Sequence, residues 1–222
     1  MAEIEIYSAT VCPFAHRSRL VLLEKEIDFE LIEIDLQNKP EGFTEISPYG
    51  KVPVIKHGDE RVWESAIINE YLDEVFPEPP LMPVDSISRA LARIWIDFAN
   101  SRFVPTFTNL LRNPDTQQQK EATEELHNQL LFMEKEGIGK RKSEGSYWFG
   151  KSVSLVDLTL YPWFERWSVI EHYRGFGLPA ECIRLKEWWE AMSQRDSVKV
   201  IANPTDYYIQ RYASYATPTA KS

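Results

Sequence analysis

Hydrophobic and polar positions alternate over short stretches in the first third of the chain, which is typical of strands separated by helices. Alternation over residues 3–7 and 29–34 predicts two strands, and residues 13–26 between them have the apolar spacing of a helix. Further on, the pattern predicts a short segment at residues 40–46, strands at 52–56 and 61–63 joined by a turn, and a helix at 65–75. Ser65 is the expected N-cap of that helix. The predicted order is βαβ, then α, then ββα.

Beyond residue 84 the apolar positions recur at helical spacing. Five of them form one stripe on a predicted first helix: Ile87, Leu91, Ile94, Trp95 and Phe98. Further helices are predicted at residues 116–136, 155–173 and 181–194, and Ser154-Leu-Val-Asp157 is a typical helix start. The last residues, Ala216–Ser222, are predicted to be a frayed tail.

A change in charge and composition separates these two regions. Residues 1–80 carry 17 acidic and 7 basic side chains, whereas the remainder is close to neutral. Phe76–Pro83 contains four prolines in eight residues, which suits neither a helix nor a central strand. We therefore predict an α+β domain with a mixed four-stranded sheet at 1–76, a proline-rich linker at 77–84 and an all-helical domain at 85–222.

Composition restricts the class of protein further. The 222 residues are 43% hydrophobic and have a formal net charge of -9, which argues against a nucleic-acid partner. Two cysteines cannot form a disulfide scaffold and indicate a reducing compartment. No apolar run has the length of a membrane span, and the first residues lack the features of a signal peptide. We expect a soluble cytoplasmic protein with no membrane partner.

Cys12 is the first candidate for chemistry. It follows a predicted strand and precedes Pro13, a residue favoured at the first position of a helix. The unpaired N–H groups there, with Arg17 and Arg19 nearby, would favour a thiolate, although a free cysteine is often just a small core residue. Position 15 is alanine, so the motif has no resolving cysteine, and Cys182 is expected to be structural. A lone thiolate that attacks a disulfide needs an external thiol such as glutathione to complete the cycle.

Several other residues have charges and backbone properties that suit glutathione, which carries one ammonium and two carboxylates. If Val52-Pro53 were cis, the backbone of Val52 would be free to pair with an extended peptide. Glu64 could hold the ammonium, while Ser65 and Lys39 could each meet a carboxylate. Each residue also has an ordinary structural interpretation, so only their combination is informative.

The chain resembles omega-class glutathione transferases over about residues 3–212. The resemblance rests on the motifs Ile6-Tyr7-Ser8, Cys12-Pro-Phe-Ala15, Arg17, Asn38-Lys-Pro-Glu41, Val52-Pro-Val54, Glu64-Ser65-Ala66-Ile67, Ser154-Leu-Val-Asp157 and Tyr161-Pro-Trp-Phe-Glu-Arg166. It implies a thioredoxin-like domain followed by an all-helical domain, assembled as a homodimer. It also implies thiol transfer and dehydroascorbate reduction with glutathione as co-substrate and without a metal.

The resemblance assigns roles to individual residues. Cys12 would form the mixed disulfide with glutathione, and Phe14 would line that site. Val52 would pair with the cysteinyl backbone, followed by Pro53 in cis, and Lys39 would meet the glycine carboxylate. The γ-glutamyl end would be held by Glu64 and Ser65.

The resemblance is weaker at three points. His16 replaces the acidic residue or glutamine usual in the family, and we expect it to be exposed in the first turn. The chain also begins only a few residues before its first strand, without the extension of animal omega enzymes. An acceptor pocket could be lined by Trp163, Trp167, Tyr207, Tyr208 and Tyr212, although aromatic residues at helical spacing more often belong to the core.

Two other functions remain open. A classical conjugating transferase would activate the thiol of glutathione itself through a hydroxyl, for which Tyr7 and Ser8 are candidates. A non-catalytic binding protein could use the same fold, since fold alone does not determine function.

Overall fold

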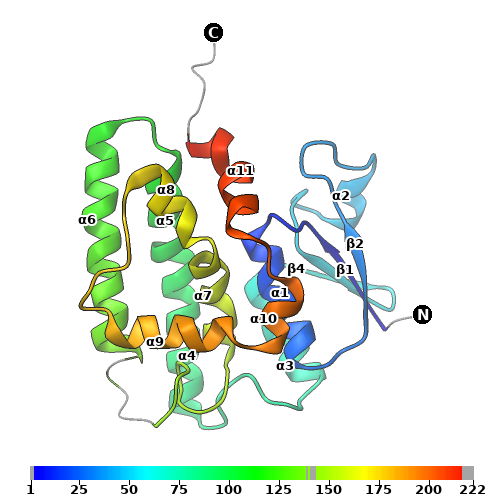
Figure 1. Cartoon of the computed structure of the whole chain (residues 1–222). Helices are drawn as coiled ribbons and strands as arrows, with labels where there is room; N and C mark the ends of the chain where they lie inside the picture. The colour runs from blue at the N-terminus through cyan, green and yellow to red at the C-terminus, as the bar shows by residue number, and fades with distance from the viewer. Residues whose placement is uncertain (1–2, 139, 141–143, 217–222) are drawn as a thin grey trace. The chain divides into compact units, whose positions relative to one another are not determined.

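The chain consists of two units, Met1–Val84 and Asp85–Ser222, each with its own packed interior (Figure 1). The structure is a computed structural model that describes residues 3–138, 140 and 144–216. The predicted frayed tail lies outside the described residues from position 217 onward, while Ala216 is the last residue of a helix.

The first unit contains a four-stranded mixed sheet in the order β2-β1-β3-β4. The central strand β1 is parallel to β2 and antiparallel to β3, and β3 forms an antiparallel hairpin with β4. This is the predicted thioredoxin-like order, now confirmed. Its elements are β1 (Ile4–Ser8), α1 (Pro13–Glu24), β2 (Phe29–Glu33), α2 (Phe43–Ile46), β3 (Val54–His57), β4 (Glu60–Trp63) and α3 (Ser65–Val75).

The core of this unit lies between the central strands and the helices α1 and α3. The side chains of Ile4 and Ile6 on β1 and of Val54 and Ile55 on β3 are fully buried. Helices α1 and α3 pack against each other, and a buried hydrogen bond joins them, from Ser18 Oγ to Asn69 Oδ1 at 2.8 Å. This packing fixes both helix N-termini relative to the sheet.

The proline-rich segment 77–84 is held against the first unit by a buried ion pair. Lys25 Nζ lies 2.8 Å from Asp73 Oδ1, and it also donates to the carbonyl oxygen of Pro79 at 2.8 Å. The Asp73 carboxylate accepts hydrogen bonds from the backbone N–H groups of Leu81 and Met82. Segment 77–84 therefore shares the polar contacts of α1 and α3.

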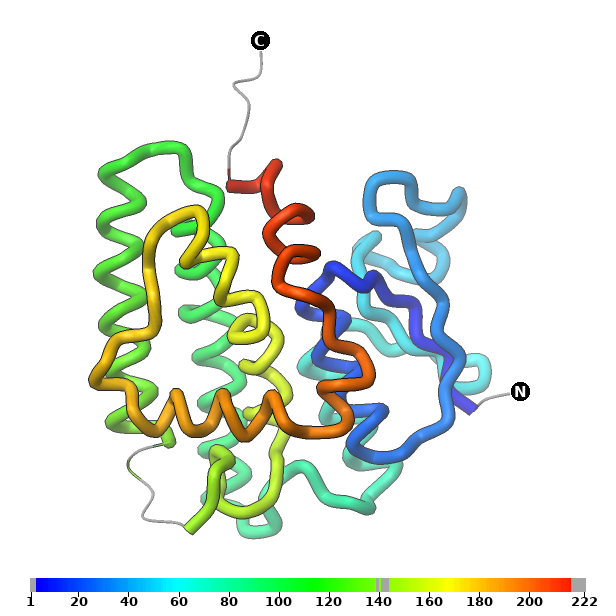
Figure 2. Tube along the Cα trace, viewed as in Figure 1, coloured from blue at the N-terminus to red at the C-terminus, as the bar shows by residue number. Residues whose placement is uncertain are grey.

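The second unit is helical, as predicted, and among its described residues the sole β-type pairing is an isolated bridge between Tyr147 and Gly150. In Figure 2 the trace of α5 runs beside that of α6, and an extended segment connects α8 to α9. None of the helices in the described ranges is long and apolar enough to cross a membrane. The elements are α4 (Ser86–Phe98), a π-helical turn (Ala99–Phe103), α5 (Val104–Arg112), α6 (Thr116–Phe132), a second π-helical turn (Met133–Ile138), α7 (Leu155–Glu165), α8 (Trp167–Arg174), α9 (Ile183–Ser193), α10 (Asp196–Ile201) and α11 (Thr205–Ala216).

Several details of the helical unit differ from the predictions. The helix predicted over residues 155–173 breaks at Arg166, which separates α7 from α8. The apolar stripe of α4 is only partly buried, because Ile87 and Ile94 are 73% and 58% exposed. Apolar periodicity located one face of this helix but could not show how much of it is covered.

A buried carboxylate holds the start of α7. Asp157 Oδ2 accepts hydrogen bonds from the backbone N–H and the hydroxyl of Ser154, at 2.7 and 2.6 Å. Asp157 Oδ1 accepts from the backbone N–H of Trp148 and from Nε1 of Trp188, at 2.8 and 2.7 Å. Burial raises the pKa of Asp157, while these hydrogen bonds act in the opposite direction. One side chain thus joins the loop before α7, α7 itself and α9.

We expect Asp157→Asn to lower the free energy of unfolding by about 3 kcal/mol, because the amide NH₂ would face two buried donors. Urea denaturation followed by tryptophan fluorescence measures this loss. The matched control is Asp115→Ala, which removes the exposed cap of α6, where Asp115 accepts from the Gln118 N–H at 2.8 Å. That variant should lose only about 1 kcal/mol. Equal losses in the two variants would contradict the role assigned to Asp157.

Candidate active site

Cys12 occupies the corner between β1 and α1. It is the N-cap residue of α1, with extended backbone, and Pro13 occupies the first helical turn. The Cys12 N–H donates to Ala9 O at 2.9 Å, and the Cys12 carbonyl accepts from the His16 N–H at 3.0 Å. Its half-buried thiol therefore lies at the N-terminus of the helix, where partial positive charge favours a thiolate.

A buried cation, Arg17, extends from α1 behind this corner. Its Nη1 donates to Ser65 Oγ at 3.3 Å, and its guanidinium carbon lies 5.0 Å from the centre of the Phe14 ring. Burial lowers the pKa of Arg17 to about 9, while the negative charge of Cys12 acts to raise it. Arg17 is therefore charged at pH 7, and by reciprocity its charge favours the Cys12 thiolate.

The prediction that His16 is exposed is wrong, because its side chain is fully buried. Residues 15–22 of α1 are all buried, so this helix is covered on every side rather than along one stripe. The weak amphipathic pattern of α1 was the sequence signal for this burial.

A cavity of about 110 Å³ brings together five of the predicted glutathione-contacting residues: Phe14, Val52, Pro53, Glu64 and Ser65. The Sγ atom of Cys12 lies 3.8 Å from the carbonyl oxygen of Val52, which is part of this lining. Lys39 does not line the cavity. Its Nζ donates to the carbonyl oxygen of Gly50 at 2.7 Å, and Lys51 lines the cavity instead.

Val52 has the backbone property that the sequence suggested. The Val52-Pro53 peptide bond is cis. Val52 precedes β3, which begins at Val54, and its N–H and C=O have no backbone partner within the described ranges. The Val52 N–H is therefore available to an extended peptide beside Cys12, while the Val52 carbonyl accepts from the Cys12 thiol at 3.8 Å and would change partner when that thiol reacts.

The start of α3 differs from the prediction. Ser65 is the first helical residue, and Glu64 is the N-cap. The Ser65 hydroxyl accepts a hydrogen bond from Arg17, and Glu64 has a φ of 69°, a conformation that non-glycine residues rarely adopt. Strain of this kind is concentrated at functional sites. Glu64 and Ser65, at the start of α3, both line the cavity.

Sequence reasoning missed other residues of this lining, namely Ser47, Tyr49, Lys51 and Trp63. Ser47 Oγ accepts from the Lys51 N–H at 2.9 Å and donates to the Lys51 carbonyl at 2.6 Å, which closes a tight loop before Val52. The available signal was Pro48-Tyr-Gly-Lys51, a turn sequence that leads directly into the cis-proline strand.

Two family models match the chain, each within one unit. The model described as glutathione S-transferase, N-terminal domain, matches residues 11–75, and the corresponding C-terminal domain matches residues 116–191. Omega-1 glutathione S-transferase of Sus scrofa is 34% identical over 203 residues, which are 89% of this chain and 80% of the relative. The chain belongs to the glutathione S-transferase family.

Other relatives of this glutathione S-transferase support the omega-class resemblance. The omega-1 enzyme of Mus musculus is 35% identical over 95% of this chain and 86% of its own. The solved structure of glutathione transferase Omega 3C from Trametes versicolor has a TM-score of 0.86 at 29% identity, covering 97% and 91% of the two chains.

Two further solved structures are similar to this transferase. Rice GST1 in complex with glutathione has a TM-score of 0.84 at 29% identity, over 97% and 99% of the two chains. Dehydroascorbate reductase from Chlamydomonas reinhardtii has a TM-score of 0.80 at 26% identity, over 96% and 98%.

The aromatic residues suggested for the acceptor pocket of the transferase lie in the helical unit, and most of them are buried. Trp163, Trp167, Tyr208 and Tyr212 are each at most 8% exposed. Tyr208 is also held by polar contacts, since its hydroxyl donates to Glu165 Oε1 at 3.0 Å. Their role toward an acceptor stays a prediction.

The two cysteines of the transferase should differ in reactivity. Cys182 is 1% exposed, and burial, reinforced by the carboxylates of Glu134 and Glu181, raises its pKa to about 11. We expect iodoacetamide at pH 7 to modify Cys12 at least about tenfold faster, as read from the alkylated peptides by mass spectrometry. The control is Cys12→Ser, which retains only Cys182 and should stay unmodified. Earlier modification of the peptide that contains Cys182 would refute the assignment.

Proposed function

We propose that this glutathione S-transferase is a thiol transferase and dehydroascorbate reductase that acts through a mixed disulfide at Cys12. The observation that carries the proposal is the position of the Cys12 thiol. It lies at the N-terminus of α1, in the electrostatic field of the buried Arg17 and beside the backbone of Val52. A thiol with these neighbours is poised to react as a thiolate.

Thiol transfer proceeds in two balanced displacements. The Cys12 thiolate attacks the glutathionyl sulfur of a mixed disulfide, forms a Cys12–glutathione disulfide and releases the acceptor as a thiolate, which takes up a proton. A second glutathione thiolate then attacks the same glutathionyl sulfur, so that oxidised glutathione leaves and the Cys12 thiolate is regenerated. Alanine at position 15 means that no neighbouring thiol in the motif competes for the second step.

Dehydroascorbate reduction fits the same cycle. It needs two electrons and two protons, which two glutathione thiols supply as they become one disulfide. In the first step the thiols of Cys12 and of the first glutathione are oxidised to their mixed disulfide, and their two electrons and two protons reduce dehydroascorbate to ascorbate; the second glutathione thiolate then attacks the glutathionyl sulfur, which releases oxidised glutathione and the Cys12 thiolate. The similarity to the Chlamydomonas reinhardtii dehydroascorbate reductase supports this substrate.

The cavity beside Cys12 suggests how glutathione is oriented. The N–H and C=O of Val52 would pair with the cysteinyl backbone, in a cavity that Pro53 and Phe14 also line. Glu64 would hold the γ-glutamyl ammonium, and Ser65 the γ-glutamyl carboxylate at the N-terminus of α3. The glycine carboxylate would meet Lys39, as the resemblance implies, or Lys51, which lies in the lining.

The alternative of classical conjugation needs a hydroxyl that stabilises the thiolate of glutathione. The Tyr7 hydroxyl donates to Glu5 Oε2 at 3.0 Å, and burial together with this carboxylate raises the pKa of Tyr7. Ser8 is fully buried. Neither hydroxyl is placed or polarised for this task, so conjugation is the weaker of the two proposals. A non-catalytic role would leave unexplained why a half-buried thiol lies beside the Arg17 cation and the backbone of a cis-proline segment.

We also propose a homodimer that operates in the cytoplasm, where glutathione can complete the cycle. The exposed apolar side chains Ile94 and Phe132 support a dimer, because they flank a cavity of about 500 Å³ that Trp95 and Phe98 also line. Sedimentation of the purified chain measures its state, and a monomer at micromolar concentration would contradict the dimer.

We expect Cys12→Ser to lose activity toward both dehydroascorbate and a glutathionylated thiol, because a serine hydroxyl cannot form the mixed disulfide. Conjugation of an aryl halide should persist or rise in the same variant, since a hydroxyl at this position can stabilise a glutathione thiolate. The three assays are run side by side on wild type and variant. Cys182→Ser is the matched control and should retain both reductase activities. Retention of these activities by Cys12→Ser would exclude the mechanism.

Substitution of Lys39 and of Lys51 should show which of the two lysines contacts glutathione. Removing the lysine that meets the glycine carboxylate should raise the KM for glutathione about threefold or more while kcat changes little, as expected for an exposed charged contact. Steady-state kinetics of Lys39→Ala and Lys51→Ala measure this, with Lys120→Ala on α6 as an exposed control. An unchanged KM in both variants would refute a lysine contact to glutathione.

A further inference from the structure

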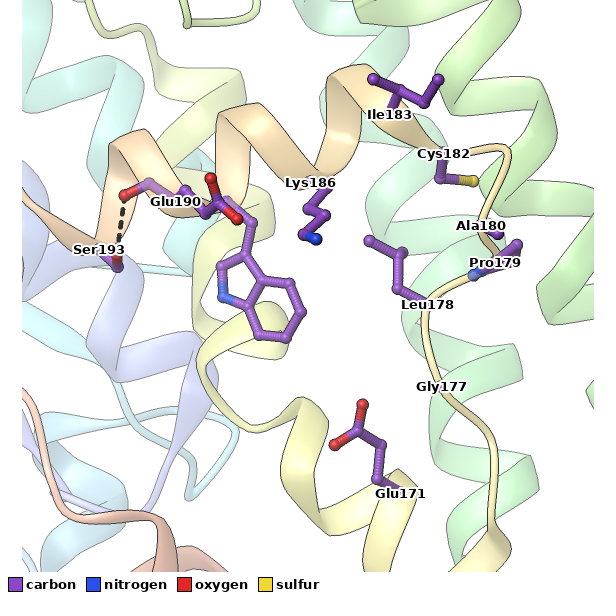
Figure 3. A pocket seen from close by; sticks show the side chains of 11 residues that line it. Glu171, Gly177, Leu178, Pro179, Ala180, Cys182, Ile183, Lys186, Glu190 and Ser193 are labelled. Carbon is purple, nitrogen blue, oxygen red and sulfur yellow. Dashed lines mark hydrogen bonds between the residues drawn. The ribbon is translucent and has the colours of Figure 1, made fainter.

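The helical unit contains a second cavity, of about 770 Å³, that the proposed reaction does not use. Its lining comes from α8, the segment 177–182 and α9 (Figure 3). This volume is in the range of small-molecule sites. Figure 3 shows Lys186 from α9 and Glu171 from α8 extending into the space that Leu178 bounds from the connecting segment.

The apolar part of this cavity includes an aromatic ring with a fixed orientation. Trp189 is half-buried and contributes to the lining. Its indole packs edge-on against Phe164 and Trp167, with ring centroids 5.7 and 6.5 Å apart. The fully buried Phe164 and Trp167 hold the indole from the protein side, so Trp189 offers a preformed surface for a flat apolar group.

The polar part of the cavity has an excess of negative charge. Glu171, Glu190 and Lys186 line it, and none of these three side chains forms an ion pair or side-chain hydrogen bond within the described ranges. The Glu171 carboxylate lies against Gly177, where Oε1 is 3.7 Å from the position of an added Cβ. A ligand could therefore meet these carboxylates without displacing an existing partner.

The end of the cavity at Cys182 is apolar, because Leu178, Ala180 and Cys182 line it, so the charged groups of the cavity are those of Glu171, Glu190 and Lys186. A carboxylate environment together with the face of an indole attracts organic cations, because both attract positive charge. Lys186 opposes this only in part, since the lining holds two carboxylates and this one ammonium.

We propose that this cavity binds an alkyl amine that carries a flat aromatic ring, with the ring on Trp189 and the ammonium toward Glu171 and Glu190. Binding here needs neither Cys12 nor glutathione, so it is independent of the proposed transferase reaction. Lys186 determines which ligands are preferred. Its ammonium repels a ligand with two positive charges, and it can meet the carboxylate of a zwitterionic ligand.

Three probes with the same indole ring but different charges show how much each charge contributes to binding. Tryptamine carries an ammonium, indole-3-acetate a carboxylate, and tryptophan both. Titration of the ¹⁵N-labelled full chain, followed through the tryptophan indole N–H signals, should give the tightest binding for tryptamine and the weakest for indole-3-acetate. The signal of Trp189, assigned with Trp189→Phe, should shift most.

Substitutions test the charged contacts. Glu171→Gln and Glu190→Gln should each weaken tryptamine binding about three- to fivefold, the effect of one solvent-exposed ion pair. Lys186→Gln should strengthen tryptamine binding by a similar factor. The matched controls are Glu187→Gln on the same helix and Lys199→Gln on α10, neither of which lines the cavity.

The proposal is overturned if indole-3-acetate binds as tightly as tryptamine, or if the largest shifts occur at other tryptophans. It is also overturned if the control variants weaken tryptamine binding as much as Glu171→Gln and Glu190→Gln. Binding that persists in Cys12→Ser, with Trp189 as the responding signal, would support a site separate from the reaction.

Discussion

The buried charge of Arg17 is the constraint on which the geometry around Cys12 depends. Taking a guanidinium out of water is costly, so the groups around it must offset that loss. They include the Ser65 hydroxyl, the face of the Phe14 ring and the negative charge of Cys12. The hydrogen bond from Arg17 to Ser65, which helps to offset this cost, therefore also holds the N-termini of α1 and α3 beside one cavity.

Much of the first unit could be predicted from local patterns. Alternation revealed the strands, and Pro13 after Cys12 revealed the corner, because both signals depend only on neighbouring residues. The burial of His16 and the positive φ of Glu64 could not be predicted in this way. They arise from the packing of α1 and from the chain reversal between β4 and α3, which involve residues far apart in the sequence.

The lysines show the same limit within the site. The charge of Lys39 and the family resemblance both predict that it meets a carboxylate; in the structure its ammonium donates to the carbonyl oxygen of Gly50, and Lys51 lines the cavity, so the contact of Lys39 stays a prediction. The conformation of residues 38–51 decides which lysine ammonium lies at the cavity beside Cys12. That conformation depends on contacts such as the two hydrogen bonds between Ser47 and Lys51. In the helical unit, Ser154 and Asp157 indicate a helix start. No local pattern indicates that the Asp157 carboxylate also accepts a hydrogen bond from Trp188 Nε1, 31 residues away.

The hydrogen bonds around Asp73 affect how the first unit can be studied alone. Its carboxylate and the ammonium of Lys25 together engage Pro79, Leu81 and Met82, so residues that composition marks as a spacer supply partners for a buried ion pair. A fragment that stops at Phe76 would leave this pair without three of its hydrogen bonds. A fragment that ends at Val84, the last residue of the first unit, would keep all of them and is the better recombinant piece for studying the cavity beside Cys12.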